Sequence, residues 1–271
     1  MLHFERVESN VGTPNKSFLF LHGILGSGGN LRSIARRLVA ADSSWSVVLV
    51  DLRGHGKSPV GEAPHTLLGC VGDLEALGGT LAYPARGILG HSFGGKVALA
   101  YAGTHRAELE RLVVVDSMPG ARRGGLGSEG TLSVIEALKR VDAFYATRDS
   151  FIDALVKQGV ERTTAMWLAM SLKREPEGLR MTFDMKVIDA LLDDYLEVDL
   201  WSVLSLGTRF NTQVIIGEKS NVFTEEDRAR CHALEVDSKV EVVTLPAGHS
   251  VHVDDADGLV NALANPAKEP S

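Results

Sequence analysis

Short apolar runs alternate along the chain with longer segments whose apolar positions recur at helical spacing. The runs are rich in Val, Ile and Leu, which is typical of strands buried on both faces of a sheet. They cover residues 18–22, 45–51, 86–90, 111–116, 212–217 and 239–245. The helical segments cover residues 30–41, 65–81, 95–105, 224–234 and 254–263. This alternation predicts an α/β protein with a mostly parallel sheet and helices on both faces, and the opening LHFERVE adds a candidate edge strand.

One interval, from about residue 118 to residue 206, interrupts this alternation. It shows no convincing buried strand, and amphipathic helical segments recur in it at 131–141, 149–160 and 163–175. We therefore expect a core formed by residues 1–117 and 207–271, with a helical cap inserted at residues 118–206. The insertion opens with PGARRGGLGSEG, which suits a mobile loop. Its large apolar residues, expected to pack mainly in its own core, are Met166, Trp167, Met170, Met181, Phe183 and Met185.

Composition and charge narrow the range of partners. The 271 residues are 44% hydrophobic and 23% charged, enough for a full core. The net charge of -7 argues against a nucleic-acid surface or an anionic membrane surface. No membrane span or secretory leader is predicted, so we expect a cytoplasmic protein or a processed organelle form. Cys70 and Cys231 are read as buried free thiols, and the sequence leaves the oligomeric state open.

The stretch LGHSFGGKV, residues 89–97, has two interpretations. Gly90, Gly95 and Lys96 spell most of a phosphate-binding loop, but Val97 stands where a magnesium-binding Ser or Thr is required. Gly90, Ser92 and Gly94 spell G-x-S-x-G, a turn between strand and helix that presents a nucleophilic serine. The flanking strand and helix favour the serine interpretation, which gives Lys96 no special task.

A serine nucleophile needs a general base and donors for the developing oxyanion. His249 follows the last predicted strand on a glycine-containing loop, where this fold order places the base. His252 is expected to make a structural hydrogen bond, and a His249–His252 metal pair lacks a third ligand at recognisable spacing. The glycine-rich turn LHGILGSGG offers the Ile24 amide as one oxyanion donor, and the Phe93 amide after the serine is the other.

Four stretches together resemble the α/β-hydrolase superfamily over nearly the whole chain: LHGILGS, DLRGHGKS, GHSFGG and AGHSVH. Within it the chain is most similar to small esterases of the YbfF and abhydrolase-domain-11 type. The resemblance implies a helical cap between strands six and seven of the family fold, in agreement with the insertion. It also implies that DLRGHGKS is a structural loop, in which Arg53 and His55 hold loops together.

The resemblance leaves two candidates for the acid that orients His249. Many relatives carry an aspartate shortly after the strand TQVIIG, but Ser220 occupies that position here and Glu218 is the nearest carboxylate. The other location known in the superfamily gives Asp116, at a strand end and in the chain order Ser, Asp, His. We favour Asp116 because a carboxylate on a strand end reorganises less than one on a loop.

These residues predict a serine hydrolase that cleaves small-molecule carboxylic esters or thioesters, without a metal or organic cofactor. The cap is expected to supply an apolar acyl pocket. Other serine-dependent reactions on the same scaffold stay open: perhydrolysis, C–C bond hydrolysis and acyl transfer. An alternative of another class is a receptor that keeps the hydrolase fold but turns its ligand over slowly and recruits a partner.

Overall fold

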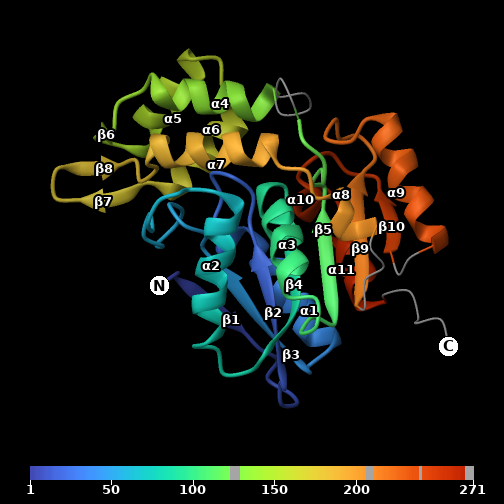
Figure 1. The fold of residues 1–271 in the computed structure, drawn as a ribbon. Coiled ribbons are helices and arrows are strands. Elements are labelled where there is room, and N and C mark those ends of the chain that lie inside the picture. The colour runs from blue at the N-terminus through green and yellow to red at the C-terminus, as the bar shows by residue number, and fades with distance from the viewer. Residues whose placement is uncertain (123–128, 206–209, 238–239, 266–271) are drawn as a thin grey trace.

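The computed structural model describes residues 1–122, 129–205, 210–237 and 240–265. A seven-stranded sheet lies at its centre, in the order β1-β3-β2-β4-β5-β9-β10 (Figure 1). Its strands are β1 (Phe4–Val7), β2 (Lys16–Leu21), β3 (Trp45–Val50), β4 (Ala85–His91), β5 (Arg111–Val115), β9 (Asn211–Gly217) and β10 (Val240–Leu245). The edge strand β1 pairs antiparallel with β3, and the other pairs are parallel. The predicted mostly parallel sheet is confirmed, although Lys239 lies outside the described residues.

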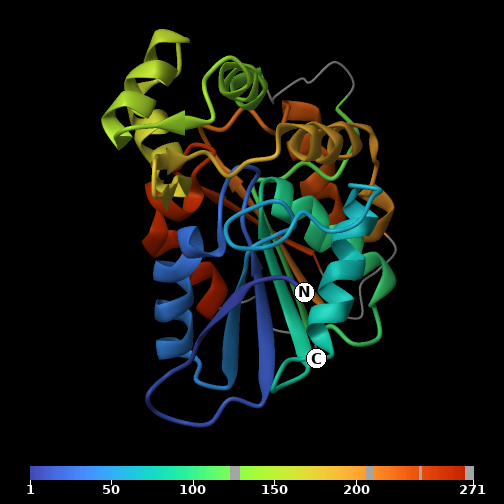
Figure 2. The ribbon, with the colours of Figure 1, turned by 90° about the vertical axis from the view of Figure 1, so that its left-hand side faces the viewer.

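Helices cover both faces of this sheet (Figure 2). One face carries α1 (Arg32–Ala41) and α11 (Ala256–Ala264), and the other carries α2 (Leu67–Gly78) and α3 (Phe93–Thr104). Three further elements complete the core: the 3-10 helix η1 (Gly28–Leu31), α9 (Glu225–Asp237) and α10 (Val251–Asp254). The helical segments expected from spacing are therefore present, with ends shifted by a few residues.

The strands face two separate apolar cores because successive side chains of a strand point to opposite faces. Phe18 and Phe20 of β2 pack with α1 and α11. Leu19 and Leu21 of the same strand pack with α2 and α3. All four side chains are completely buried, which explains why the sequence shows continuous apolar runs rather than alternation.

Most of the chain between β5 and β9 lies above the carboxyl edge of the sheet, whereas its last described helix, α8 (Trp201–Ser205), packs beside α3 (Figures 1 and 2). Its other helices are α4 (Glu129–Lys139), α5 (Arg148–Lys157), α6 (Arg162–Leu168), the 3-10 helix η3 (Ala169–Ser171) and α7 (Met185–Glu197). Residues 123–128 of the expected mobile loop and Leu206, the expected end of the insertion, lie outside the described residues. We refer to the described residues 129–200 as the insertion.

The insertion also contains a small antiparallel sheet that the sequence analysis missed. Its strands are β6 (Phe144–Tyr145), β7 (Lys173–Glu175) and β8 (Gly178–Arg180), in the order β6-β8-β7. The helical run expected at 163–175 ends at Ser171, and β7 begins at Lys173. Pro176 lies in the turn that follows β7, and Gly178, with φ 145°, begins the returning strand of the hairpin. Strands this short carry too little periodicity to be recognised from sequence.

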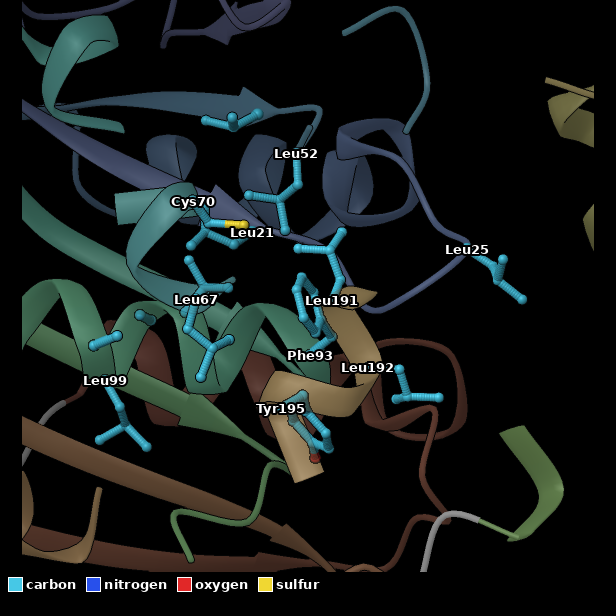
Figure 3. Close-up of a cluster of buried hydrophobic side chains, with 14 of the residues drawn as sticks. Leu21, Leu25, Leu52, Leu67, Cys70, Phe93, Leu99, Leu191, Leu192 and Tyr195 are labelled. Carbon is cyan, nitrogen blue, oxygen red and sulfur yellow. The ribbon is translucent and has the colours of Figure 1, made fainter. Parts of the chain in front are cut away.

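Helix α7 joins the insertion to the core on the α2 and α3 face. Its apolar stripe includes Leu191, Leu192 and Tyr195, which lie near Leu67 and Phe93 in one cluster (Figure 3). The insertion and this face of the sheet therefore share a core, whereas the α1 and α11 face has its own.

Two smaller expectations concern the cysteines and the membrane. Cys70 and Cys231 are both buried free thiols, as predicted. Among the described residues, no helix is long and apolar enough to cross a membrane.

Candidate active site

Ser92 lies on a sharp turn between β4 and α3. Its backbone has φ 54° and ψ -122°, a conformation that residues with a side chain rarely adopt. A Cβ atom at Gly90 would come within 1.9 Å of the Gly94 carbonyl oxygen, and one at Gly94 within 2.5 Å of the His22 carbonyl oxygen. The Ser92 amide donates to the Val115 carbonyl at 3.0 Å. The glycines thus permit the close packing that holds the turn.

The structure brings Ser92, His249 and Asp116 together from three different parts of the chain. Ser92 Oγ lies 3.0 Å from His249 Nε2, and His249 Nδ1 lies 2.7 Å from Asp116 Oδ2. Because the carboxylate accepts from Nδ1, Nε2 is left as the acceptor for the serine hydroxyl. This is the geometry needed to move a proton from the serine to the histidine.

Asp116 is completely buried at the end of β5. Its amide donates to the Ile215 carbonyl at 2.7 Å, and its backbone then turns with φ 43°. The carboxylate accepts from the Gly217 amide at 3.0 Å and from Ser220 Oγ at 2.6 Å, besides His249. A buried carboxylate held by three donors has one fixed orientation.

The rival acid, Glu218, is exposed, and no hydrogen bond joins it to His249 within the described residues. Ser220 is the residue that sequence reasoning missed at this end of the sheet. Arg228 of α9 donates to the Gly217 and Ser220 carbonyls, which fixes the turn that carries the Ser220 hydroxyl. The one signal available was position, since Ser220 stands where many relatives carry their acid.

The two proposed oxyanion donors come from two different turns near the serine, because Phe93 follows Ser92 directly and Ile24 follows Gly23. Neither the Ile24 nor the Phe93 amide has a hydrogen-bond partner within the described part of the chain. Gly23 lies so close to the turn between β4 and α3 that a Cβ atom at Gly23 would come 3.3 Å from Ser92 Cβ. Leu25, with φ 62°, turns the chain away directly after Ile24. Both free amides therefore belong to segments that lie close to Ser92.

Two buried histidines fix this turn to the loop that follows β3. His55 Nε2 accepts from the Leu25 amide at 3.0 Å, and His22 Nε2 accepts from the Leu52 amide at 3.0 Å. Burial lowers the pKa of His55 to about 3 and also lowers the pKa of His22, so both rings are neutral near pH 7. Arg53 bonds to the Asp73 carboxylate and three carbonyls. These contacts agree with the loop-holding role expected of Arg53 and His55.

His91 and His252 lie close to His249. His91 Nε2 donates to the His249 carbonyl at 2.8 Å, and burial holds the His91 pKa well below its usual value. The centre of the His252 ring lies 4.8 Å from that of the His91 ring, and His252 Nδ1 has no hydrogen-bond partner among the residues that the structure describes. The structural hydrogen bond expected of His252 is thus replaced by ring packing. The described residues contain no group of three or more His, Cys, Asp or Glu side chains placed to hold a metal ion.

The insertion carries a cavity of ≈ 660 Å³ at the base of the β7–β8 hairpin. Met181, Phe183 and Met185 line it together with charged side chains, so its wall is more polar than the expected acyl pocket. The Phe183 ring lies 6.2 Å from that of His55, which places this side of the cavity against the loop that braces the oxyanion turn. Met166 and Met170, expected to pack mainly in the insertion's core, are 54% and 68% exposed.

Comparisons with known proteins give the family of this chain and several of its relatives. The family model described as alpha/beta hydrolase family matches residues 18–262. The chain is 30% identical over 241 residues to the sn-1-specific diacylglycerol lipase ABHD11 of Danio rerio, covering 87% of this chain and 73% of that protein. It is 27% identical over 255 residues to esterase YbfF of Escherichia coli, covering 92% of each. A marine microorganism esterase shares the fold at TM-score 0.82 and 24% identity, over 96% of this chain and 97% of that one.

Proposed function

Because this chain belongs to the alpha/beta hydrolase family, we propose that it is a serine hydrolase that cleaves carboxylic esters or thioesters through an acyl-enzyme on Ser92. The family and its esterase and lipase relatives support hydrolase activity. The finer assignment is carried by one observation, the hydrogen-bonded chain from Ser92 through His249 to Asp116.

In the first step, Ser92 Oγ attacks the carbonyl carbon of the substrate while His249 Nε2 takes the hydroxyl proton. Asp116 accepts the hydrogen bond from Nδ1 and stabilises the imidazolium that forms. Because the Gly217 amide and Ser220 hydroxyl already hold the carboxylate, little reorganisation accompanies this change of charge.

The negative charge that develops on the carbonyl oxygen is stabilised by the Ile24 and Phe93 amides. Each donor of this kind contributes about 3–4 kcal/mol of transition-state stabilisation in enzymes with comparable sites. The neutral His55 supports one of them indirectly, since its bond to the Leu25 amide holds the chain directly after Ile24.

The tetrahedral intermediate then collapses, the C–O or C–S bond breaks, and His249 returns its proton to the leaving alcohol or thiol. His249 next removes a proton from water, and the resulting hydroxide attacks the acyl-enzyme. Collapse of the second intermediate releases the acid and returns the proton to Ser92. The two steps together use only these residues and one water, and they leave Ser92 and His249 in their starting protonation states.

Acyl groups are proposed to bind beside the insertion, in the cavity at Phe183, whose ring lies near His55 on the loop that holds the Ile24 turn. The relatives named diacylglycerol lipase and esterase support acyl esters as substrates. We expect short and medium acyl chains to be preferred, because the charged part of the cavity wall disfavours a long apolar tail.

The deciding experiment is intact-mass analysis after exposure to a small fluorophosphonate, for the wild type and for Ser92→Ala. We expect one adduct on the wild type and none on the variant. Hydrolysis of acetyl to octanoyl esters, matched thioesters and matched amides then defines the leaving group. The absence of an adduct on folded wild type would contradict the proposal and favour the slow-turnover receptor.

A further inference from the structure

Lys96 is the charged residue to which sequence reasoning gave no task. It lies in the first turn of α3, four residues after Ser92, and its side chain is completely buried. Its Nζ donates to the Gly120 carbonyl at 2.8 Å and to the Tyr195 carbonyl, and lies 4.7 Å from the centre of the Tyr195 ring. Burying an ammonium costs hydration that such contacts recover only in part. Stability alone therefore does not account for a lysine at this position.

The first carbonyl belongs to the segment that leads toward the insertion, and the second belongs to the last residues of the insertion itself. We call these segments, residues 119–122 and 195–200, the neck. Backbone hydrogen bonds join the two segments, from Arg122 to Leu196 and from Leu200 to Pro119. Lys96 thus connects a helix of the core to both sides of the neck at one point.

The same helix connects Lys96 to the proposed catalytic serine. The Lys96 amide donates to the Ser92 carbonyl at 3.3 Å. The Phe93 ring, next to the serine, lies 6.0 Å from the Tyr195 ring at the end of α7 (Figure 3). A shift of the neck would therefore move the Tyr195 ring, which packs on Phe93, the residue whose amide is a proposed oxyanion donor.

We propose that Lys96 is a positioning residue that holds the neck, and with it the insertion, at a fixed place over Ser92. The proposal rests on the serine-hydrolase function proposed above for what it positions. Acyl chains that reach the insertion should depend on Lys96, whereas an acetyl group, held at Ser92 and the two amides, should depend on it little.

The charges around Lys96 give this contact a pH dependence. Burial lowers the Lys96 pKa to about 8, Asp199 and Asp194 oppose the shift, and Arg122 adds to it. Tyr195 stays neutral, since burial raises its pKa to about 12. As the pH rises through 8, the ammonium becomes an amine, a weaker donor to the two carbonyls.

The test compares Lys96→Met with Lys157→Met, which removes an exposed lysine from α5 of the insertion. In the Lys96 variant we expect KM for a hexanoyl ester to rise about tenfold, and kcat for an acetyl ester to fall less than about threefold. In the wild type, KM for the hexanoyl ester should rise between pH 7 and pH 9. An equal loss of kcat/KM on the hexanoyl and acetyl esters would overturn the proposal. So would a wild-type KM for the hexanoyl ester that does not change between pH 7 and pH 9. The wild-type profile decides the matter if the variant does not fold.

Amide hydrogen exchange separates this proposal from the proposed function. We expect the Arg122 and Leu200 amides to exchange about tenfold faster in Lys96→Met than in Lys157→Met, with β4 unchanged. If these amides exchange faster in Lys96→Met but the wild type forms no fluorophosphonate adduct, the role of Lys96 in holding the neck is kept and the proposed hydrolase function is overturned. A normal adduct with unchanged exchange would overturn the role of Lys96.

Discussion

The carboxyl edge of the large sheet and the insertion above it are ordered in different ways. At the edge, Ser92 and Asp116 sit in strained backbone conformations, and ladder bonds from neighbouring strands hold both. In the insertion, order comes mainly from apolar packing, as where Phe151 meets Tyr145 with ring centres 5.2 Å apart. The carboxyl edge of the sheet holds the side-chain atoms of the candidate site at hydrogen-bond distances. The insertion determines the shape of the surface above them.

This difference separates chemistry from substrate selection. Hydrogen-bonded side chains on strand ends tolerate little displacement, which suits proton transfer between Ser92 and His249. The packed helices and short hairpin of the insertion can change in sequence while the insertion still covers the site. The comparison predicts that changes at the edge affect reactivity, whereas changes in the insertion affect stability and substrate range.

The largest expected effect is at the edge, in Asp116→Asn. An amide cannot stabilise the imidazolium as the carboxylate does, so we expect kcat/KM to fall about 10³- to 10⁴-fold on the preferred ester. Glu218→Gln is the matched control and should stay within about twofold. Steady-state kinetics on variants with equal thermal melting would check this. Loss in Glu218→Gln with activity kept in Asp116→Asn would transfer the role to Glu218.

The second change tests whether the insertion contributes only shape. Phe151→Ala empties a completely buried site in α5, and we expect it to lower the free energy of unfolding by about 3–5 kcal/mol. Met170→Ala, at an exposed site, should change it by less than about 0.5 kcal/mol. Urea unfolding measures both. Fluorophosphonate labelling of folded Phe151→Ala should stay near the wild-type rate, and a large loss would mean that the insertion also fixes Ser92.

The smallest effect concerns the loops beneath the edge and depends on pH. His55 has a folded pKa of about 3 against about 6.5 when unfolded, so between these values the unfolded chain binds more protons. Stability should therefore fall as the pH falls below 6.5, by about 2 kcal/mol at pH 5 from His55 alone. Urea unfolding at pH 7 and pH 5 should show a correspondingly smaller fall in His55→Gln.

The control for this measurement is His232→Gln, which removes an exposed histidine from α9. It should keep the wild-type dependence on pH. An equal fall in the wild type and in His55→Gln would show that the buried ring does not couple folding to protonation, and that the brace on Leu25 has another basis.

Local patterns predicted most of the fold and two of the three side chains that meet at the candidate site, Ser92 and His249. The parallel strands, the helices on both faces, the glycines around Ser92 and the loop of His249 were all predicted. Each follows from residues adjacent in the chain, where strand burial and turn geometry impose a short-range signature. The small sheet of the insertion was missed because two- and three-residue strands leave no such signature.

The sequence by itself determined the architecture and the positions of Ser92 and His249 at the ends of strands, because side-chain periodicity and the steric demands of a tight turn act over a few residues. The sequence favoured Asp116 over Glu218, but only the tertiary structure shows that Asp116 contacts His249, that Ser220 supports it, and that Lys96 joins the neck. Asp116 lies 133 residues from His249 and 104 from Ser220, and Lys96 lies 99 from Tyr195. Contacts over such separations exist only after the strands have aligned and α7 has packed on the core, so no local pattern could specify them.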